Sequence, residues 1–183
     1  MSTPNSLFVS RTLLQVEHVE FRGNIDRFNH DMPGVTLQWR RLGQAGVMLV
    51  QSGEYQDLTR QPRGRLAARP VRQVVAALND GILAGKERRT VPLKSAAFLE
   101  NKGEPYVHIG YVIEPEHLIS DREEVTAELD RMNRVPGDWR FAFQPYISLA
   151  TLDANFADGT VLGAFQAMMP PGATLHGARA QAG

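Results

Sequence analysis

Cysteine is absent from the 183-residue sequence. That absence excludes disulfide bonds, thiolate metal ligands and cysteine nucleophiles, and it agrees with a reducing compartment. No apolar run approaches the roughly 20 residues that a membrane-spanning helix needs, and the first residues lack the pattern of a secretory signal. We therefore expect a soluble, cytoplasmic protein without a membrane partner.

A net charge is also lacking, because 20 basic residues balance 20 acidic ones. No overall field attracts nucleic acid or a membrane, so any such partner must be held by a local patch. A hydrophobic fraction of 43% is enough to form a core, and the chain length fits one compact domain or two small lobes. We expect one two-lobed domain over residues 1–169 and a flexible tail over 170–183.

Common nucleotide and hydrolase motifs are missing as well. The sequence has no P-loop, no GxGxxG fingerprint and no GxSxG nucleophile elbow. Its five histidines show no metal-ligand spacing. We therefore expect neither a metal ion nor a cofactor.

The hydrophobic pattern predicts an α+β protein with largely antiparallel sheets. Two β-rich lobes, over residues 1–89 and 90–169, would each carry a helix. Strands are expected over 11–22, 35–40, 45–51, 90–100, 106–114 and 139–152, helices over 70–85, 120–135 and 158–169, and a long loop over 52–69.

Two of these strands carry a clear polar face. In the strand over 106–114, His108 lies opposite the apolar residues. In the strand over 35–40, alternation places Gln38 and Arg40 on the same side as Thr36, away from the apolar side chains. The apolar residues of that strand are Val35, Leu37 and Trp39.

Two short segments match each other, PGVTL at 33–37 and PYISL at 145–149. Both read proline, any residue, β-branched apolar residue, hydroxyl residue, leucine. On a strand, positions i and i+2 point to one side. Each segment therefore presents a variable residue and a hydroxyl, Thr36 or Ser148, together on one face.

The pair resembles the two His-x-Thr/Ser motifs of the two-histidine phosphoesterases, the 2′-5′ RNA ligase-like superfamily. The order of strand, strand, helix and motif strand over residues 90–153 is similar to that family's. The resemblance implies two lobes around a shared groove that takes a 2′-5′ or 2′,3′-cyclic phosphodiester. It also implies that Thr36 and Ser148 bind phosphate oxygens.

The sequence departs from the family at both histidines, where Gly34 and Tyr146 stand. Glycine cannot transfer a proton, and tyrosine, with a pKa near 10, is a poor base at neutral pH. The candidates for a rebuilt catalytic group are Tyr146 itself, His30, His108 and His18. The alternative is that these histidines are ordinary surface or boundary residues.

Arginine is concentrated in one region, the thirteen residues of 60–72, which contain no acid. Guanidinium groups suit bidentate phosphate contacts. We expect Arg63 and Arg65 to help hold phosphate, together with Gln38 and Arg40 in the groove. The alternative is a solvated loop or a protein-contact arm. The arginines of this region are Arg60, Arg63, Arg65, Arg69 and Arg72.

Two functions follow from the sequence. The first is a phosphoesterase-like protein that binds, and less readily hydrolyses, a phosphodiester of RNA or a nucleotide. The second is a non-enzymatic assembly protein that uses the arginine-rich loop and the tail as contact arms. The sequence gives neither an oligomeric state nor a specific substrate.

Overall fold

The structure is a computed structural model of the whole chain. It describes residues 7–14, 18–40, 45–50, 71–86, 89–100, 102–133, 139, 143–168 and 173–182.

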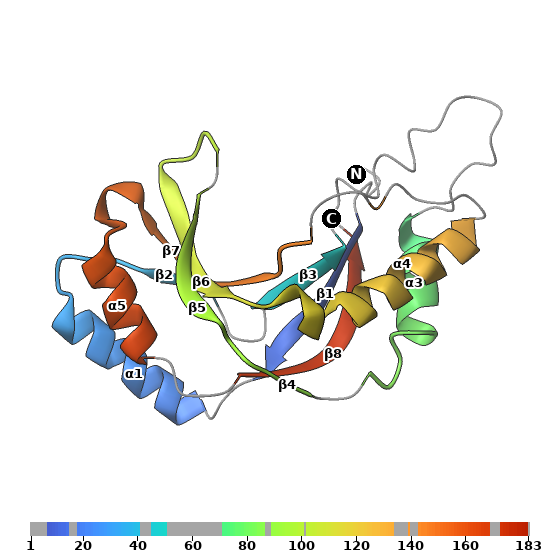
Figure 1. Ribbon diagram of the computed structural model, residues 1–183, viewed down its shortest axis with the longest axis horizontal. Helices are drawn as coiled ribbons and strands as arrows, with labels where there is room; N and C mark the ends of the chain where they lie inside the picture. The colour runs from blue at the N-terminus through green and yellow to red at the C-terminus, as the bar shows by residue number, and fades with distance from the viewer. Residues whose placement is uncertain are drawn as a thin grey trace.

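The chain forms two four-stranded antiparallel sheets with helices beside them, which confirms the α+β class (Figure 1). Sheet A has the order β3-β1-β8-β4 and sheet B the order β2-β7-β6-β5. Sheet A contains β1 (Leu7–Leu14), β3 (Gly46–Val50), β4 (Arg89–Val91) and β8 (Ala173–Ala182). Sheet B contains β2 (Gln38–Trp39), β5 (Ser95–Glu100), β6 (Tyr106–Val112) and β7 (Tyr146–Asp153).

The helices divide between the two sheets. Figure 1 shows α1 and α5 at the sheet B end of the molecule, and α3 and α4 beside sheet A. No helix among the described residues is long and apolar enough to span a bilayer. The helices are α1 (His18–Asp31), α3 (Val71–Asp80), α4 (Ile119–Asn133) and α5 (Gly159–Met168), with short 3-10 turns η2 (Pro115–His117) and η3 (Ala154–Phe156).

The C-terminal segment is a strand, so the prediction of a flexible tail over 170–183 is wrong for its described residues. β8 pairs with both β1 and β4 in the middle of sheet A. The Asn79 side chain holds it from α3, since it donates to the Ala180 carbonyl and accepts from the Ala180 amide. The strand was missed because its small side chains give only a weak hydrophobic pattern. A central strand is nevertheless stabilised by backbone hydrogen bonds along both of its edges.

The two lobes are interleaved along the chain and do not divide at residue 90. Sheet A takes strands from both ends of the chain, while sheet B takes residues 38–39 and the middle of the chain. The strand predicted over 90–100 is in fact two strands, β4 in sheet A and β5 in sheet B. Pro92, which has no amide hydrogen to donate, lies between them.

The prediction of one strand over 11–22 is also wrong, because β1 ends at Leu14 and α1 begins at His18. The segment after residue 22 is helical as far as Asp31. Its apolar residues Ile25, Phe28 and Met32 recur at helical spacing and pack against the core. Gly23 and the nearby asparagines are poor helix formers, so the helical spacing of these apolar residues was not recognised in the sequence.

The pairing of β6 with β7 contains a β-bulge. Ile109 pairs with Ala150, but Gly110 pairs with Ser148, so β7 has one extra residue at this point. Leu149 and Ala150 are consequently both buried. The bulge brings the strands so close that a Cβ on Gly110 would lie 1.7 Å from the Ile147 carbonyl oxygen.

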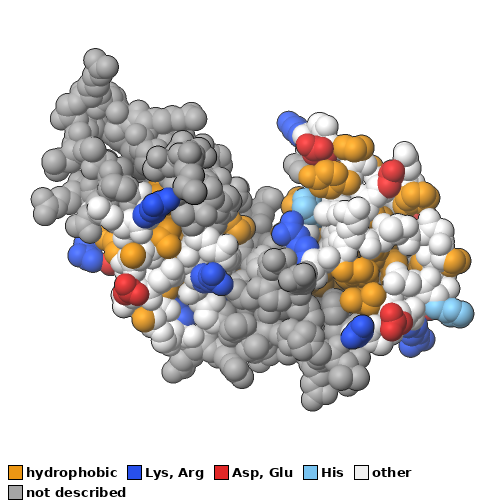
Figure 2. All heavy atoms as spheres, turned by 180° about the vertical axis from the view of Figure 1, so that it is seen from behind, with side chains coloured by type: hydrophobic (Ala, Val, Ile, Leu, Met, Phe, Trp, Pro, Cys, Tyr) orange, Lys and Arg blue, Asp and Glu red, His pale blue; other side chains and the backbone are white. Residues whose placement is uncertain are grey.

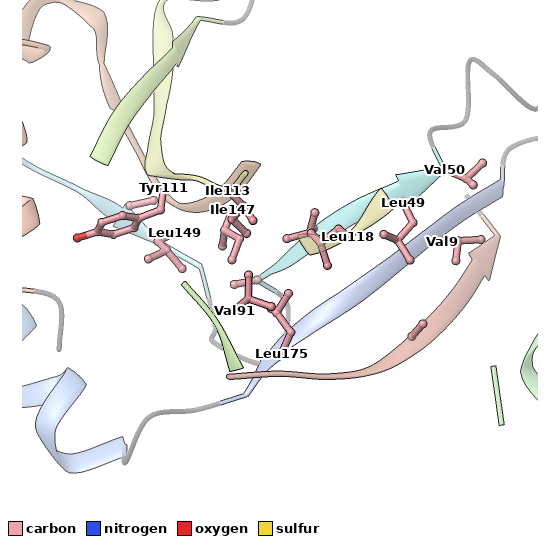
Figure 3. Close-up of a cluster of buried hydrophobic side chains, with 14 of the residues drawn as sticks. Val9, Leu49, Val50, Val91, Tyr111, Ile113, Leu118, Ile147, Leu149 and Leu175 are labelled. Atoms are coloured by element: carbon pink, nitrogen blue, oxygen red, sulfur yellow. The ribbon is translucent and has the colours of Figure 1, made fainter. Parts of the chain in front are cut away.

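One hydrophobic cluster joins the two sheets. Figure 3 shows Leu49 and Leu175 of sheet A and Ile147 of sheet B among its members. A charged pair lies at the edge of this core, where Arg11 of β1 donates to both carboxylate oxygens of Asp121 on α4, at 2.8 and 3.0 Å. Both side chains are buried, so the pair fixes α4 against sheet A.

Asp121→Asn should lower the free energy of unfolding by about 3–5 kcal/mol, because it leaves the Arg11 charge buried without its carboxylate. Asp31→Asn is the matched control, since Asp31 forms an exposed ion pair with Arg27 on α1. That change should cost less than about 0.5 kcal/mol. Urea denaturation of both variants measures the difference, and equal small effects would contradict this role of the buried pair.

Gly110→Ala should destabilise the fold by about 1–3 kcal/mol or more, because the new methyl group cannot fit against the Ile147 carbonyl. Gly163→Ala on α5 is its control, since a Cβ there meets nothing within 4 Å. Alanine in a helix is favoured over glycine, so this variant should gain about 0.5–1 kcal/mol. Thermal unfolding of the two proteins should shift in opposite directions.

Candidate functional site

An inner cavity of about 550 Å³ lies between the two sheets. Figure 2 shows the molecule hollowed between its lobes, with a histidine and basic side chains at the edge of the hollow. Sheet A contributes Ser10, Gly46, Met48 and Gln181 to the lining, and sheet B with its neighbouring segments contributes Arg40, Leu99, His108, Phe143, Gln144, Tyr146 and Ser148.

Strands β3 and β7 provide facing pairs of positions in this cavity. Gly46 and Met48 of β3 line it from sheet A, and Tyr146 and Ser148 of β7 line it from sheet B. In each strand the two residues are at positions i and i+2, which face the same side of the strand. The segments GVML at 46–49 and YISL at 146–149 therefore line the cavity from the two sheets.

The prediction that Thr36 faces Ser148 from the opposite lobe is wrong. Thr36 lies just before β2, and β2 pairs with β7 in the same sheet. The sequence pattern correctly placed Ser148 on the open face of β7, but it held no information on which strands share a sheet. Gly46 and Met48 were not recognised from the sequence because neither residue can transfer a proton. Their only signal was the leucine at position 49, which follows Gly46 by three residues as Leu149 follows Tyr146.

The side chains of His108 and Ser148 meet at the centre of the site. His108 Nδ1 lies 2.9 Å from Ser148 Oγ. The bulge produces this contact, because it places Ser148 beside Gly110 and keeps Thr151 opposite His108 on the same face. Strict alternation along β7 would have buried Thr151 with Ile147.

Arg40 lies close to this pair. Its backbone amide donates to the Leu149 carbonyl at 2.9 Å, which fixes the residue beside β7. Trp39 packs between Phe28 and Phe165, so the flanking Arg40 side chain points away from the core and is exposed. Partial burial lowers the pKa of His108, and the Arg40 guanidinium lowers it further. The ring is therefore neutral at neutral pH.

Tyr146 keeps its proton in this arrangement. Its hydroxyl donates to the Ala97 carbonyl at 2.9 Å, and burial raises the pKa of the phenol well above its usual range. The side chain therefore forms a fixed wall of the inner cavity and is not set up to exchange a proton near neutral pH.

An outer cavity of about 710 Å³ adjoins the inner one, and Arg40 and His108 line both. It contains Thr36 and Gln38, so these two predicted residues do lie near Arg40. We call the two cavities together the groove. The remaining residues of the outer cavity are Pro105, Tyr106, Thr151, Leu152, Asp153 and Phe156.

Other predicted residues lie elsewhere. His30 is exposed in the last turn of α1 and lines neither cavity. Arg63 and Arg65, with the rest of the region 60–70, fall outside the described residues, as does the side chain of His18. Within the described ranges, no three acidic or histidine side chains gather where they could hold a metal ion.

No protein-family model and no curated protein matches the sequence. Among solved structures, Usb1 of Kluyveromyces marxianus superposes with a TM-score of 0.56 over 99% of this chain and 95% of that chain, at 10% identity. TT0787 of Thermus thermophilus reaches 0.45 at 19% identity, over 81% of this chain and 75% of its own. A second structure of Kluyveromyces marxianus Usb1, with uridine monophosphate, reaches 0.43 at 10% identity over 90% and 81%.

The first of these likenesses extends over nearly all of both chains, and at 10% identity it concerns the fold alone. The chain therefore has a fold similar to that of Kluyveromyces marxianus Usb1.

Proposed function

We propose that the groove binds a phosphodiester of a nucleotide or of RNA, with the phosphate where the two cavities meet. The observation that carries the proposal is the contact between His108 and Ser148 beside the exposed Arg40. A guanidinium, a hydroxyl and an imidazole can together offer several donors to phosphate oxygens. Thr36 and Gln38 add further donors from the wall of the outer cavity.

The fold supports a nucleotide as the ligand class. Kluyveromyces marxianus Usb1, whose fold is similar to this one, has also been solved with uridine monophosphate. The groove between the sheets takes residues from both lobes. A ligand that fills the inner cavity would contact both sheets. Within that class, we propose 2′,3′-cyclic and 2′-5′ linked phosphodiesters as the ligands to test first.

The facing positions on β3 and β7 favour binding over hydrolysis by two histidines. Acid–base catalysis needs groups that exchange protons near neutral pH. Gly46 has no side chain, and Tyr146 has a raised pKa. His108 is the one histidine that lines the groove among the described residues, so no second imidazole is placed to complete a pair.

Backbone packing also excludes a histidine at position 46. A Cβ on Gly46 would lie 2.7 Å from the Arg11 carbonyl oxygen of the neighbouring strand. Any larger residue would have to move β3 or β1. A histidine therefore does not fit at position 46 without a shift of the sheet A backbone, so a single substitution there does not supply a second imidazole.

The test is to measure binding of uridine 2′,3′-cyclic phosphate to the wild type and to Arg40→Ala by calorimetry. Removing the guanidinium should weaken binding roughly 10- to 150-fold, since hydrogen bonds to a charged group contribute about 1.5–3 kcal/mol. Arg27→Ala is the matched control, because Arg27 is exposed on α1 outside the groove. It should bind like the wild type, and hydrolysis by the wild type should stay near the background rate.

Two outcomes would contradict the proposal. Equal binding by the wild type and Arg40→Ala would remove Arg40 from the site. Rapid turnover of the cyclic phosphate would show that the groove is catalytic without two histidines, and His108→Gln would then be the next variant to assay.

Binding of the same ligand should strengthen as pH falls. Burial and Arg40 lower the pKa of His108 in the free protein, and a bound anion beside the ring should raise it. A group whose pKa rises on binding takes up a proton, so affinity increases between about pH 7.5 and pH 5.5, where histidine titrates. A phosphodiester keeps one fixed charge over this range, so the ligand adds no titration of its own.

His108→Gln should abolish this pH dependence, while His30→Gln should leave it as in the wild type. Retention of the dependence in the His108 variant would assign it to another group.

The arginine-rich region remains a separate prediction. If Arg63 and Arg65 extend the phosphate site, binding of single-stranded RNA should depend steeply on salt, with a slope of about −0.7 per neutralised phosphate. A protein partner for this region stays a prediction as well.

A further inference from the structure

The exposed apolar side chains are not scattered evenly over the surface. The large hydrophobic residues that are exposed in the described part of the chain are Leu99, Ile119 and Phe156, at 48%, 45% and 44%. Leu99 lines the inner cavity and Phe156 lines the outer one, while Ile119 lies outside both. Two of these three exposed apolar side chains therefore lie in the groove, where a bound ligand would cover them.

The open face of sheet B connects the two cavities. Cross-strand pairing places four residues in one row, Leu99 on β5, His108 on β6, Thr151 on β7 and Gln38 on β2. Residues directly opposite each other project from the same face. The row therefore continues from the apolar Leu99, past His108 at the junction, to polar groups in the outer cavity.

Two aromatic side chains, Tyr106 and Phe156, line the outer cavity. Tyr106 lies edge-on to His108, with ring centroids 5.8 Å apart, and Phe156 lines the same cavity from η3. Two hydrogen bonds anchor the start of the turn that carries Phe156. The Ala154 amide donates to the Pro105 carbonyl at 3.0 Å, and the Asn155 amide donates to Asp153 Oδ1 at 2.9 Å. The backbone that carries Phe156 is therefore held by hydrogen bonds, while the side chain is exposed to solvent.

We propose that the ligand is a dinucleotide or the end of a longer single-stranded RNA, and that Phe156 with Tyr106 forms a second nucleoside subsite. This inference rests on the proposed function and adds the size of the ligand. The phosphate lies at Arg40 and His108, where the cavities meet, so one nucleoside extends into the inner cavity and the other into the outer cavity. The second base stacks on the exposed ring of Phe156. Gln38 and Thr36 line the same cavity and can hydrogen-bond to the polar edge of that base.

Two ligands of equal charge test the inference. Uridine 2′,3′-cyclic phosphate has one nucleoside, and uridylyl-uridine has two, in either its 3′-5′ or its 2′-5′ linked form. Both carry a single phosphodiester charge. The wild type should bind a dinucleotide more tightly by about 5- to 150-fold, the range that stacking of one base gives. The preferred linkage is read from the same titrations.

Phe156→Ala should remove this preference and leave binding of the cyclic mononucleotide unchanged. Phe156→Tyr keeps the ring and should keep the preference. Ile119→Ala is the matched control, since it removes an equally exposed apolar side chain outside the groove. That variant should bind both ligands like the wild type.

The outcomes separate the two proposals. If the wild type binds both ligands equally, or if Phe156→Ala weakens both to the same extent, the second subsite is wrong and phosphodiester binding stands. If the wild type binds neither ligand, the proposed function fails and this inference fails with it.

Discussion

The close approach of β6 to β7 at Gly110 is the constraint on which the rest of the site depends. Because glycine lets the two backbones come together, β7 accommodates an extra residue and the pairing shifts at Ile109. That shift aligns Ser148 and Thr151 with His108 on one open face, while it buries Leu149 and Ala150. A side chain at position 110 would force the strands apart and separate His108 from Ser148.

A second set of contacts holds the sheet A wall of the groove. Arg122 on α4 is buried, donates to the Leu49 carbonyl of β3 at 2.6 Å, and places its guanidinium 5.1 Å from the centroid of the Phe143 ring. The neighbouring Asp121 joins the same helix to β1. Arg122 of α4 therefore contacts two parts of the groove wall. These are β3, which lines the groove from sheet A, and Phe143, which precedes β7. These contacts fix the sheet A wall of the groove against α4.

The charges of the site suit an anion better than a proton-transfer reaction. Arg40 is exposed and lowers the pKa of His108, which keeps the free imidazole neutral. A bound phosphodiester would offset the arginine charge and let the ring take up a proton. Tyr146 does not enter this exchange, since its hydroxyl is held by Ala97 and its pKa is raised. One histidine with a lowered pKa beside one exposed arginine fits the proposed phosphodiester site and the pH dependence expected of it.

The sequence alone determined which side chains of β2 and β6 lie on the open face of sheet B. Alternation placed Gln38 and Arg40 opposite Trp39, and His108 opposite Val107 and Ile109, because a strand turns successive residues to opposite sides wherever it lies. The tertiary structure decided which strands meet. It set β3, not the segment at 33–37, across from β7, and it took the C-terminal residues into the centre of sheet A. Partner choice depends on hydrogen bonds and burial between residues far apart in the chain, and a bulge changes the alternation at one point that no local pattern marks.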